Sequence, residues 1–184
     1  KEIIELAHQQ NVPVLIDAAQ AIQHIEIYVQ SLDCDFLVFS GHKVYAETGI
    51  GVFYGKEKWL EQMAPYQVGG GMIASVHFEK TTYNTLPFKF EAGTMHYAGA
   101  IGLAAALQYL DGVGLPAIQV HERQLLTAAS RAVLEVPGVR LVGEAQERAG
   151  ALSFVIDGIQ TEEGTWRGGP IIASGKFMPE FTNA

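Results

Sequence analysis

The stretch Val12-Pro13-Val14-Leu15-Ile16-Asp17 is a short apolar run that ends on an acid. A second run, Phe36-Leu37-Val38-Phe39, ends on Ser40-Gly41-His42-Lys43, and a third covers residues 50–54. Short apolar runs of this kind are typical of strands buried on both faces. A helix-sized connection separates the first two runs. The sequence therefore predicts an α/β architecture whose sheet is covered on both faces.

Four helices accompany these strands. Helical spacing of apolar residues, or an apolar composition on all sides, predicts them over residues 1–10, 56–63, 97–110 and 115–134. Residues 97–110 are apolar nearly all round, so we expect this helix to be buried. Residues 67–85 are polar and rich in glycine, and we expect a long functional loop. Two further strands are predicted at residues 140–142 and 151–156.

Composition excludes several classes of protein. Of the 184 residues, 48% are hydrophobic and 17% charged, which excludes a wholly disordered chain. The net charge of −8 argues against nucleic acid as the main partner, because phosphate binding needs clustered Lys and Arg. No apolar run reaches the roughly 20 residues of a membrane span. Cys34, the only cysteine, excludes an internal disulfide and fits a reducing, cytosolic setting. The scattered histidines lack ligand spacing, so we predict no metal site.

Two features predict a piece of a larger protein, or a chain that buries much of its surface against a partner. Glycine is frequent, at 20 residues, and the small charged fraction leaves little polar surface for a free-standing domain. The chain also begins at Lys1 without a signal-peptide pattern.

Asp17 and Lys43 are the residues most able to carry chemistry. Each follows a predicted strand, and ligands of open α/β sheets bind outside the carboxyl ends of strands. A buried acid and lysine can form a structural ion pair. Alternatively, the lysine can hold pyridoxal 5'-phosphate (PLP) as a Schiff base while the acid pairs with the pyridine nitrogen. Spacing alone leaves both interpretations open.

Neighbouring residues favour the cofactor. Ser40 supplies a hydroxyl, Gly41 permits close approach of the backbone, and His42 supplies an imidazole, all of which suit a phosphate. Gln20 follows Asp17 closely enough to reach a ring hydroxyl.

With these motifs the chain resembles the class V aminotransferase family of PLP-dependent enzymes (fold type I). The similarity is carried by residues 14–21, 33–36 and 39–43, and further matches lie at residues 48–51, 69–73 and 90–94. It is closest to the SufS-type group II cysteine desulfurases and the selenocysteine lyases, and it covers roughly residues 1–160.

The resemblance implies a three-layer PLP-dependent transferase large domain, of which this chain is the C-terminal half, with the start of a small α+β domain. Residues 1–136 would belong to the large domain and residues 137–160 to the small one. Residues 161–184 lack periodicity and stay unassigned.

The resemblance also implies roles for six residues. Lys43 would bind the cofactor covalently and then move the substrate α-proton. Asp17 would pair with the pyridinium nitrogen, and Gln20 would hydrogen-bond the phenolic oxygen. The phosphate would be bound by Ser40 and His42, and by Thr94 of the other subunit of a homodimer.

The activity implied is that of a cytoplasmic cysteine desulfurase. It would convert L-cysteine to L-alanine and leave the sulfur as a persulfide on an enzyme cysteine, for transfer to an acceptor protein in iron–sulfur cluster assembly. Selenocysteine lyase and other class V lyases are alternatives, as is a non-catalytic fragment that acts only as an interaction module. A dinucleotide-binding domain is disfavoured, because no glycine fingerprint follows a strand and opens a helix.

The chain departs from the family pattern in two ways. Ala46-Glu47 stands where the family usually has Gly-Pro. The nucleophilic cysteine and the arginine that binds the substrate carboxylate are not recognisable. Cys34 precedes a predicted strand and is expected to be a structural thiol, and the surroundings of Arg167 do not match the family's arginine.

Overall fold

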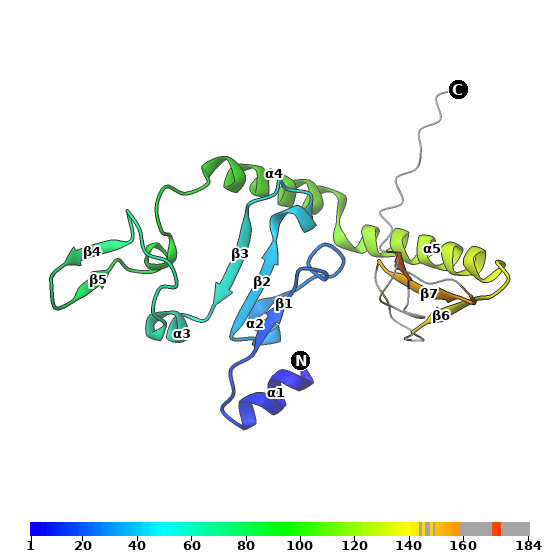
Figure 1. Cartoon of the computed structure of the whole chain (residues 1–184), viewed down its shortest axis with the longest axis horizontal. Coiled ribbons are helices and arrows are strands. Elements are labelled where there is room, and N and C mark those ends of the chain that lie inside the picture. The colour runs from blue at the N-terminus through cyan, green and yellow to red at the C-terminus, as the bar shows by residue number, and fades with distance from the viewer. Residues whose placement is uncertain (144, 146–147, 149, 159–170, 174–184) are drawn as a thin grey trace. The chain divides into compact units, whose positions relative to one another are not determined.

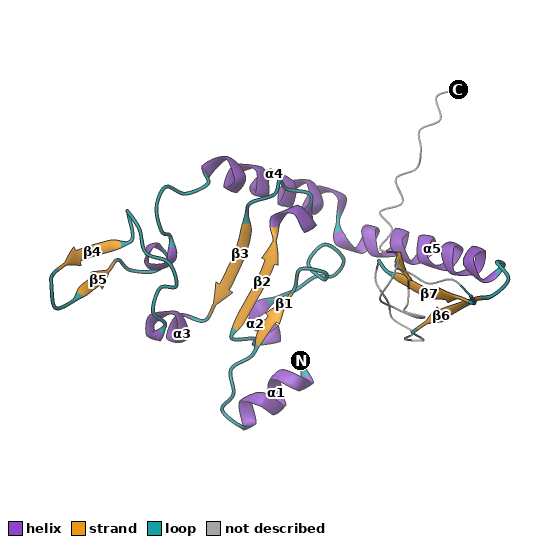
Figure 2. Ribbon diagram, in the orientation of Figure 1, coloured by secondary structure: helices purple, strands orange, loops and turns teal. Residues whose placement is uncertain are grey.

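The computed structural model describes residues 1–143, 145, 148, 150–158 and 171–173. The chain divides into two compact units, residues 1–112 and residues 113–184. Figure 1 colours the helices and strands by their position along the chain, and Figure 2 colours them by type of secondary structure.

A three-stranded sheet forms the centre of the first unit. Its strands are β1 (Leu15–Asp17), β2 (Phe36–Ser40) and β3 (Gly51–Gly55), in the order β1-β2-β3. β1 runs parallel to β2, and β3 runs antiparallel to β2. The three apolar runs of the sequence are therefore confirmed as neighbouring strands of one sheet.

Helices pack on one face of this sheet. α1 (Glu2–Gln9) contributes the buried Ile4, and the short α2 (Val29–Leu32) contributes partly buried Val29 and Leu32. They pack around Ala18, Cys34 and Leu37, which are buried, and against one side of the strands. Because side chains alternate between the two faces of a strand, Ile16, Leu37 and Tyr54 share this covered face.

The opposite face is more open than the sequence predicts. Leu15 and Phe53 point away from the core and remain 53% and 45% exposed. Phe36 stacks on Phe53 with ring centroids 5.8 Å apart, which shields part of this face. Among the described residues, the helices around Ile4 cover one face of the sheet, so the expected cover on the other face is not seen in this part of the chain.

The predicted long loop contains a β-hairpin. The loop follows α3 (Glu57–Gln62) and contains β4 (Ile73–Val76) and β5 (Thr81–Tyr83). These two strands pair antiparallel and form a separate two-stranded sheet. The hydroxyls of Ser75 and Thr82 lie 2.6 Å apart across the two strands. The glycine run up to Gly71 is a loop as predicted, but the β-branched residues after it form strands.

A short turn, η2 (Phe88–Phe90), leads to α4 (Tyr97–Val113). This helix is confirmed, but its predicted burial is wrong. Leu103 and Leu110 are buried, whereas Tyr97, Ile101 and Tyr109 are 60%, 72% and 66% exposed. A helix that is apolar on all sides needs neighbours on all sides, and the described residues bury only one side.

The second unit combines one helix with antiparallel strands. α5 (Leu115–Leu134) follows Gly114, whose φ of 84° suits glycine and separates it from α4. α5 packs against β6 (Val139–Val142) and β7 (Leu152–Ile156), and β7 pairs with β8 (Ile171–Ala173). The two strands expected after the helix are confirmed.

The unit boundary at residues 112/113 groups α5 with strands β6 to β8. The domain boundary expected after residue 136 stays a prediction. Of residues 161–184 the structure describes only β8, and Arg167 lies outside the described residues. No single helix in the described parts of the chain is long and apolar enough to cross a membrane; only the bent pair of α4 and α5 meets that criterion, by length and composition.

Candidate functional site at the carboxyl edge of the sheet

Asp17 and Lys43 lie beyond the same edge of the sheet, because β1 and β2 are parallel. Asp17 ends β1 and is the register partner of Val38. The chain continues past Asp17 with the Ala18 N–H donating to the Val38 carbonyl at 2.8 Å. β2 ends at Ser40, and Lys43 follows in a single 3₁₀ turn, η1 (Gly41–Val44). The predicted placement of the two residues at one strand edge agrees with this topology.

The turn that carries Lys43 depends on a glycine. Gly41 is buried, and a Cβ there would lie 2.6 Å from Cγ2 and 3.0 Å from the carbonyl oxygen of Ile50. Its N–H donates to that same carbonyl at 2.8 Å, and the Ala46 N–H donates to the Gly41 carbonyl at 3.1 Å. Tyr45 ends the turn with a left-handed φ of 68°. The loop after Lys43 is thus folded back onto the end of β2.

The side chains of Asp17 and Lys43 are not paired with each other. Oδ1 of Asp17 accepts a hydrogen bond from the Ala19 N–H at 2.9 Å, and the carboxylate is exposed. The half-buried Lys43 amine makes no hydrogen bond or ion pair within the described part of the chain. The structural ion pair considered from the sequence is therefore not formed. An acid and an amine stand at one edge, both available to a ligand.

The other residues assigned to the phosphate and the ring lie on the same two connections. Ser40 is half-buried at the end of β2, and His42 is exposed in η1. Gln20 is exposed in the turn that follows β1. These positions fit a ligand with a cationic ring nitrogen, a carbonyl and a phosphate, because carboxylate, amine, hydroxyl and imidazole are all presented at one edge.

Thr94 lies on a different segment, between η2 and α4, and is exposed. This segment is joined to the glycine-rich loop, since the Gly93 N–H donates to the Gly70 carbonyl at 2.9 Å. A Cβ at Gly69 would lie 3.0 Å from the Gly93 nitrogen, so the two backbones approach closely. In the described residues, Thr94 makes no hydrogen bond to the Asp17 and Lys43 group. Five of the six predicted residues therefore lie on the two connections at one edge, whereas Thr94 lies on another segment, which approaches the loop after Lys43 at His96.

Cys34 is unsuited to act as a nucleophile. Its side chain is fully buried in the core beneath β2. Burial raises the pKa of its thiol, which disfavours the reactive thiolate. This position agrees with the structural role expected from the sequence. Among the described residues, no group of three His, Cys, Asp or Glu side chains is arranged to hold a metal ion.

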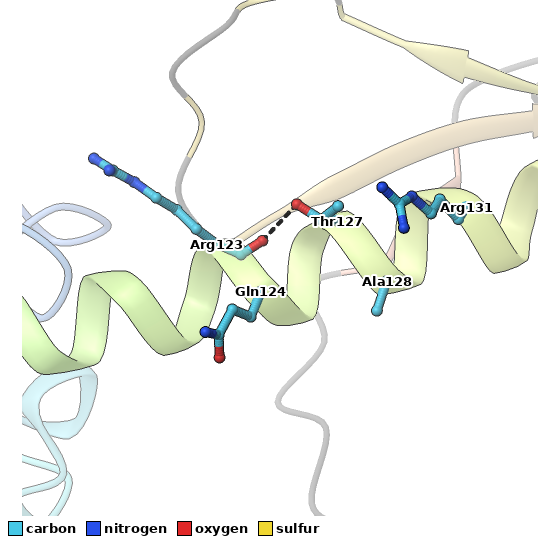
Figure 3. Close-up of a pocket in the computed structure, with 5 residues that line it drawn as sticks. All are labelled: Arg123, Gln124, Thr127, Ala128 and Arg131. Carbon is cyan, nitrogen blue, oxygen red and sulfur yellow. Dashed lines mark hydrogen bonds between the residues drawn. The ribbon is translucent and has the colours of Figure 1, made fainter.

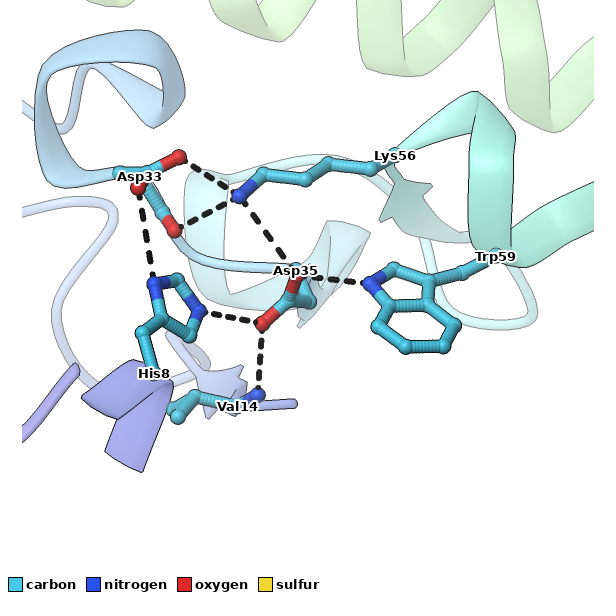
Figure 4. Close-up of polar contacts among 6 residues, drawn as sticks. All are labelled: His8, Val14, Asp33, Asp35, Lys56 and Trp59. Carbon is cyan, nitrogen blue, oxygen red and sulfur yellow. Dashed lines mark hydrogen bonds and ion pairs between the residues drawn. The ribbon is translucent and has the colours of Figure 1, made fainter. Parts of the chain in front are cut away.

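A polar cluster at the opposite edge of the sheet was missed from the sequence (Figure 4). Asp35, 1% exposed, precedes β2 and accepts hydrogen bonds from His8 Nε2 at 2.7 Å and the Val14 N–H at 2.9 Å. The Trp59 indole N–H donates to its other oxygen at 2.7 Å. Lys56 Nζ lies 2.6 Å from Asp33 Oδ1. The only sequence signal was a pair of acids just before a predicted strand.

The cluster stabilises the charged form of both acids. Burial alone raises the pKa of Asp35, but the hydrogen bonds from His8, Trp59 and the Val14 N–H outweigh burial and hold it below its ordinary value. The hydrogen bond from Lys56 lowers the pKa of Asp33 and raises that of the lysine. Because the contacts join α1, β1, β2 and α3, we assign the cluster to the stability of the fold.

A hollow on α5 is a second feature that the sequence did not indicate (Figure 3). It is lined by residues of that helix alone, namely Arg123, Gln124, Thr127, Ala128 and Arg131. The Thr127 hydroxyl donates to the Arg123 carbonyl at 2.7 Å. None of the six predicted site residues lies there.

Comparison with known proteins identifies the family. The aminotransferase class-V family matches residues 1–165. A cysteine desulfurase of Synechococcus elongatus is 51% identical over 162 residues, which is 88% of this chain and 26% of that protein. A cysteine desulfurase of Escherichia coli is 48% identical over 154 residues, 83% of this chain and 38% of that protein. The chain therefore spans well under half the length of these relatives.

A solved structure agrees. The cysteine desulfurase CsdA from Escherichia coli has a TM-score of 0.80 at 41% identity, over 85% of this chain and 39% of that one. The fold class expected from the sequence, that of the fold type I PLP-dependent enzymes, is thereby confirmed. The chain belongs to the aminotransferase class-V family.

Proposed function

We propose that this chain is the lysine-bearing portion of a PLP-dependent cysteine desulfurase. The observation that carries the proposal is the placement of Asp17 and Lys43 at the carboxyl ends of adjacent parallel strands, with neither side chain paired to the other. The names of the relatives support the substrate class, since proteins about 50% identical over most of this chain are cysteine desulfurases.

Support for the cofactor comes from the residues and from one relative. A structure of C-DES carries glycine covalently linked to PLP, and this chain matches it with a TM-score of 0.69 at 27% identity, over 79% of this chain and 39% of that one. PLP supplies an electron sink that stabilises negative charge at the substrate α-carbon. Within this chain, the Asp17 carboxylate would hold the ring nitrogen protonated. Gln20 would orient the ring through its phenolic oxygen.

Lys43 would have two tasks. Its amine would hold the cofactor carbonyl carbon covalently until the substrate displaces it. The freed amine would then accept the α-proton and return a proton to the product. Ser40 and His42 would bind the phosphate and fix the cofactor at the sheet edge. The hydrogen-bonded turn around Gly41 would set the direction from which the amine approaches.

The proposal extends to assembly. We place the protein in a cytoplasmic homodimer in which Thr94 serves the phosphate of the other subunit's site. The exposed position of Thr94 supports this role. A sulfur-acceptor protein and a place in iron–sulfur cluster assembly follow from the desulfurase reaction, which must deliver its sulfur atom to a further molecule.

Cofactor capture tests the site directly. The chain is mixed with PLP, reduced with borohydride and digested, and the modified lysine is located by mass spectrometry. We expect the label on Lys43 and a visible absorption band before reduction. Lys43→Ala should abolish both, whereas Lys80→Ala, which removes an exposed lysine of the β4–β5 hairpin, should preserve them. Saturable uptake of PLP that Lys43→Ala leaves unchanged would refute the assignment.

Substrate turnover tests the reaction. With L-cysteine, the loaded chain alone should release little sulfide, because its one cysteine is buried. With an added thiol reductant, the complete protein that contains this chain should form alanine from L-cysteine and release the sulfur as sulfide, because the reductant supplies the two electrons that the enzyme persulfide needs. Turnover of L-selenocysteine without turnover of L-cysteine would favour a selenocysteine lyase instead.

A further inference from the structure

Glu47 and His96 form a contact between two segments that both carry predicted site residues. Oε1 of Glu47 lies 3.5 Å from Nε2 of His96, and both side chains are about half exposed. Glu47 belongs to the loop that follows Lys43, and His96 directly precedes α4. Such a distance gives an ion pair when the imidazole is protonated.

Two glycines of α4 make room for this contact. A Cβ at Gly99 would lie 2.5 Å from Cδ2 of His96 and 3.2 Å from Oε1 of Glu47. A Cβ at Gly102 would lie 3.8 Å from the same oxygen. Glycine inside a helix costs about 1 kcal/mol relative to alanine. A larger residue than glycine at position 99 would collide with His96 and press against Glu47, which explains why glycine occupies this helical position.

The carboxylate of Glu47 also complements the helix itself. The first turn of α4 contains no acidic residue of its own. The N-terminus of a helix carries partial positive charge, and a nearby carboxylate stabilises it. Glu47 supplies that charge from another segment, next to Gly99 in the first turn. The side chain thus interacts with both the imidazole and the end of the helix.

Glu47 and His96 each lie on a segment that also carries a predicted site residue, Lys43 or Thr94. On one side, the loop of Glu47 is closed onto the Lys43 turn by the hydrogen bond from the Gly41 N–H to the Ile50 carbonyl. On the other side, His96 continues the segment of Thr94 into α4. A change in the Glu47–His96 contact therefore acts on both segments.

We propose that Glu47 and His96 are a positioning pair that holds the Lys43 turn and the Thr94 segment as one unit. The inference rests on the proposed function and deepens it. The contact between Glu47 and His96 restrains the loop that follows Lys43 relative to the start of α4. The pair sets where the amine and the threonine lie; it does not touch the reacting atoms.

The test is a double-mutant cycle with two readouts on the whole chain. Glu47→Gln, His96→Asn and the double variant are compared with the original chain. Hydrogen exchange of residues 44–50 and 93–99 is measured without PLP, and the rate of PLP capture is measured separately. Each single variant should speed exchange in both segments and slow capture by about twofold to fivefold. The double variant should be no worse than either single one.

Two exposed residues outside the contact provide matched controls. Glu57→Gln in α3 and His77→Asn after β4 make the same chemical changes elsewhere, and both readouts should stay at their original values. Unchanged exchange in the single variants, or effects that simply add in the double variant, would overturn the pair. If the original chain captures no PLP, the proposed function fails, while the exchange data still decide whether the pair joins the two segments.

Discussion

The indole N–H of Trp59 donates a 2.7 Å hydrogen bond to the carboxylate of Asp35, a side chain that is 1% exposed. The other oxygen of Asp35 accepts from His8 and from the Val14 N–H. This buried charge is therefore satisfied on both oxygens. It lies before β2, at the end of the sheet opposite Lys43, so its role can be tested without disturbing the cofactor edge.

Asp35→Asn should lower the free energy of unfolding by about 3 kcal/mol, because the donors around a buried carboxylate lose their charged acceptor. Urea unfolding followed by circular dichroism measures the change. Asp33→Asn is the matched control, since Asp33 lies nearby but its side chain is 62% exposed. Its cost should stay below about 1 kcal/mol. Equal costs for the two variants would show that burial of Asp35 does not matter to stability.

Stability should fall at both extremes of pH. The pKa of Asp35 and that of Asp33 are lowered from 3.8, so their contribution is present above that value and is lost as the pH falls below it. The pKa of Lys56 is raised from 10.5, chiefly by its hydrogen bond to Asp33, so its contribution is lost as the pH rises above that value. Urea midpoints should form a plateau between these limits. Asp35→Asn should flatten the acid side; an acid side of unchanged slope would contradict the assignment.

Gly41→Ala should destabilise the chain by about 1–3 kcal/mol, because its Cβ would overlap the side chain and backbone of Ile50. The Lys43 turn should shift with it, so PLP capture should slow as well. Thermal unfolding and the capture rate are the two measurements. Gly70→Ala is the control, since a Cβ there meets nothing within 4 Å. A Gly41→Ala chain with native stability and capture would show that this close approach can relax freely.

The carboxyl edge could be predicted because its signals are local. An apolar run followed by an acid, and another followed by a lysine, each span only a few residues of the chain. A helix-sized connection suits parallel pairing, and the structure pairs β1 parallel to β2. The resemblance added a role for Thr94 that spacing alone did not provide.

The polar cluster and the Glu47–His96 contact could not be predicted because their members are far apart in sequence. His8 and Trp59 meet Asp35 only after α1 and α3 have packed beside the sheet. The hydrophobic periodicity of the sequence does not show which distant polar residues come into contact in the fold. The hairpin was missed for another reason: the glycines before it dominate the composition of the segment and hide the β-branched residues after Gly71.

The burial of Cys34 gives the chain an internal reporter. A fully buried thiol reacts with an alkylating reagent only when the surrounding core opens, and this chain has no second thiol to confuse the signal. The rate of alkylation under native conditions therefore measures how often the core beneath β2 is open. Every variant considered above can be ranked by this single chemical reaction, without denaturant and at low protein concentration.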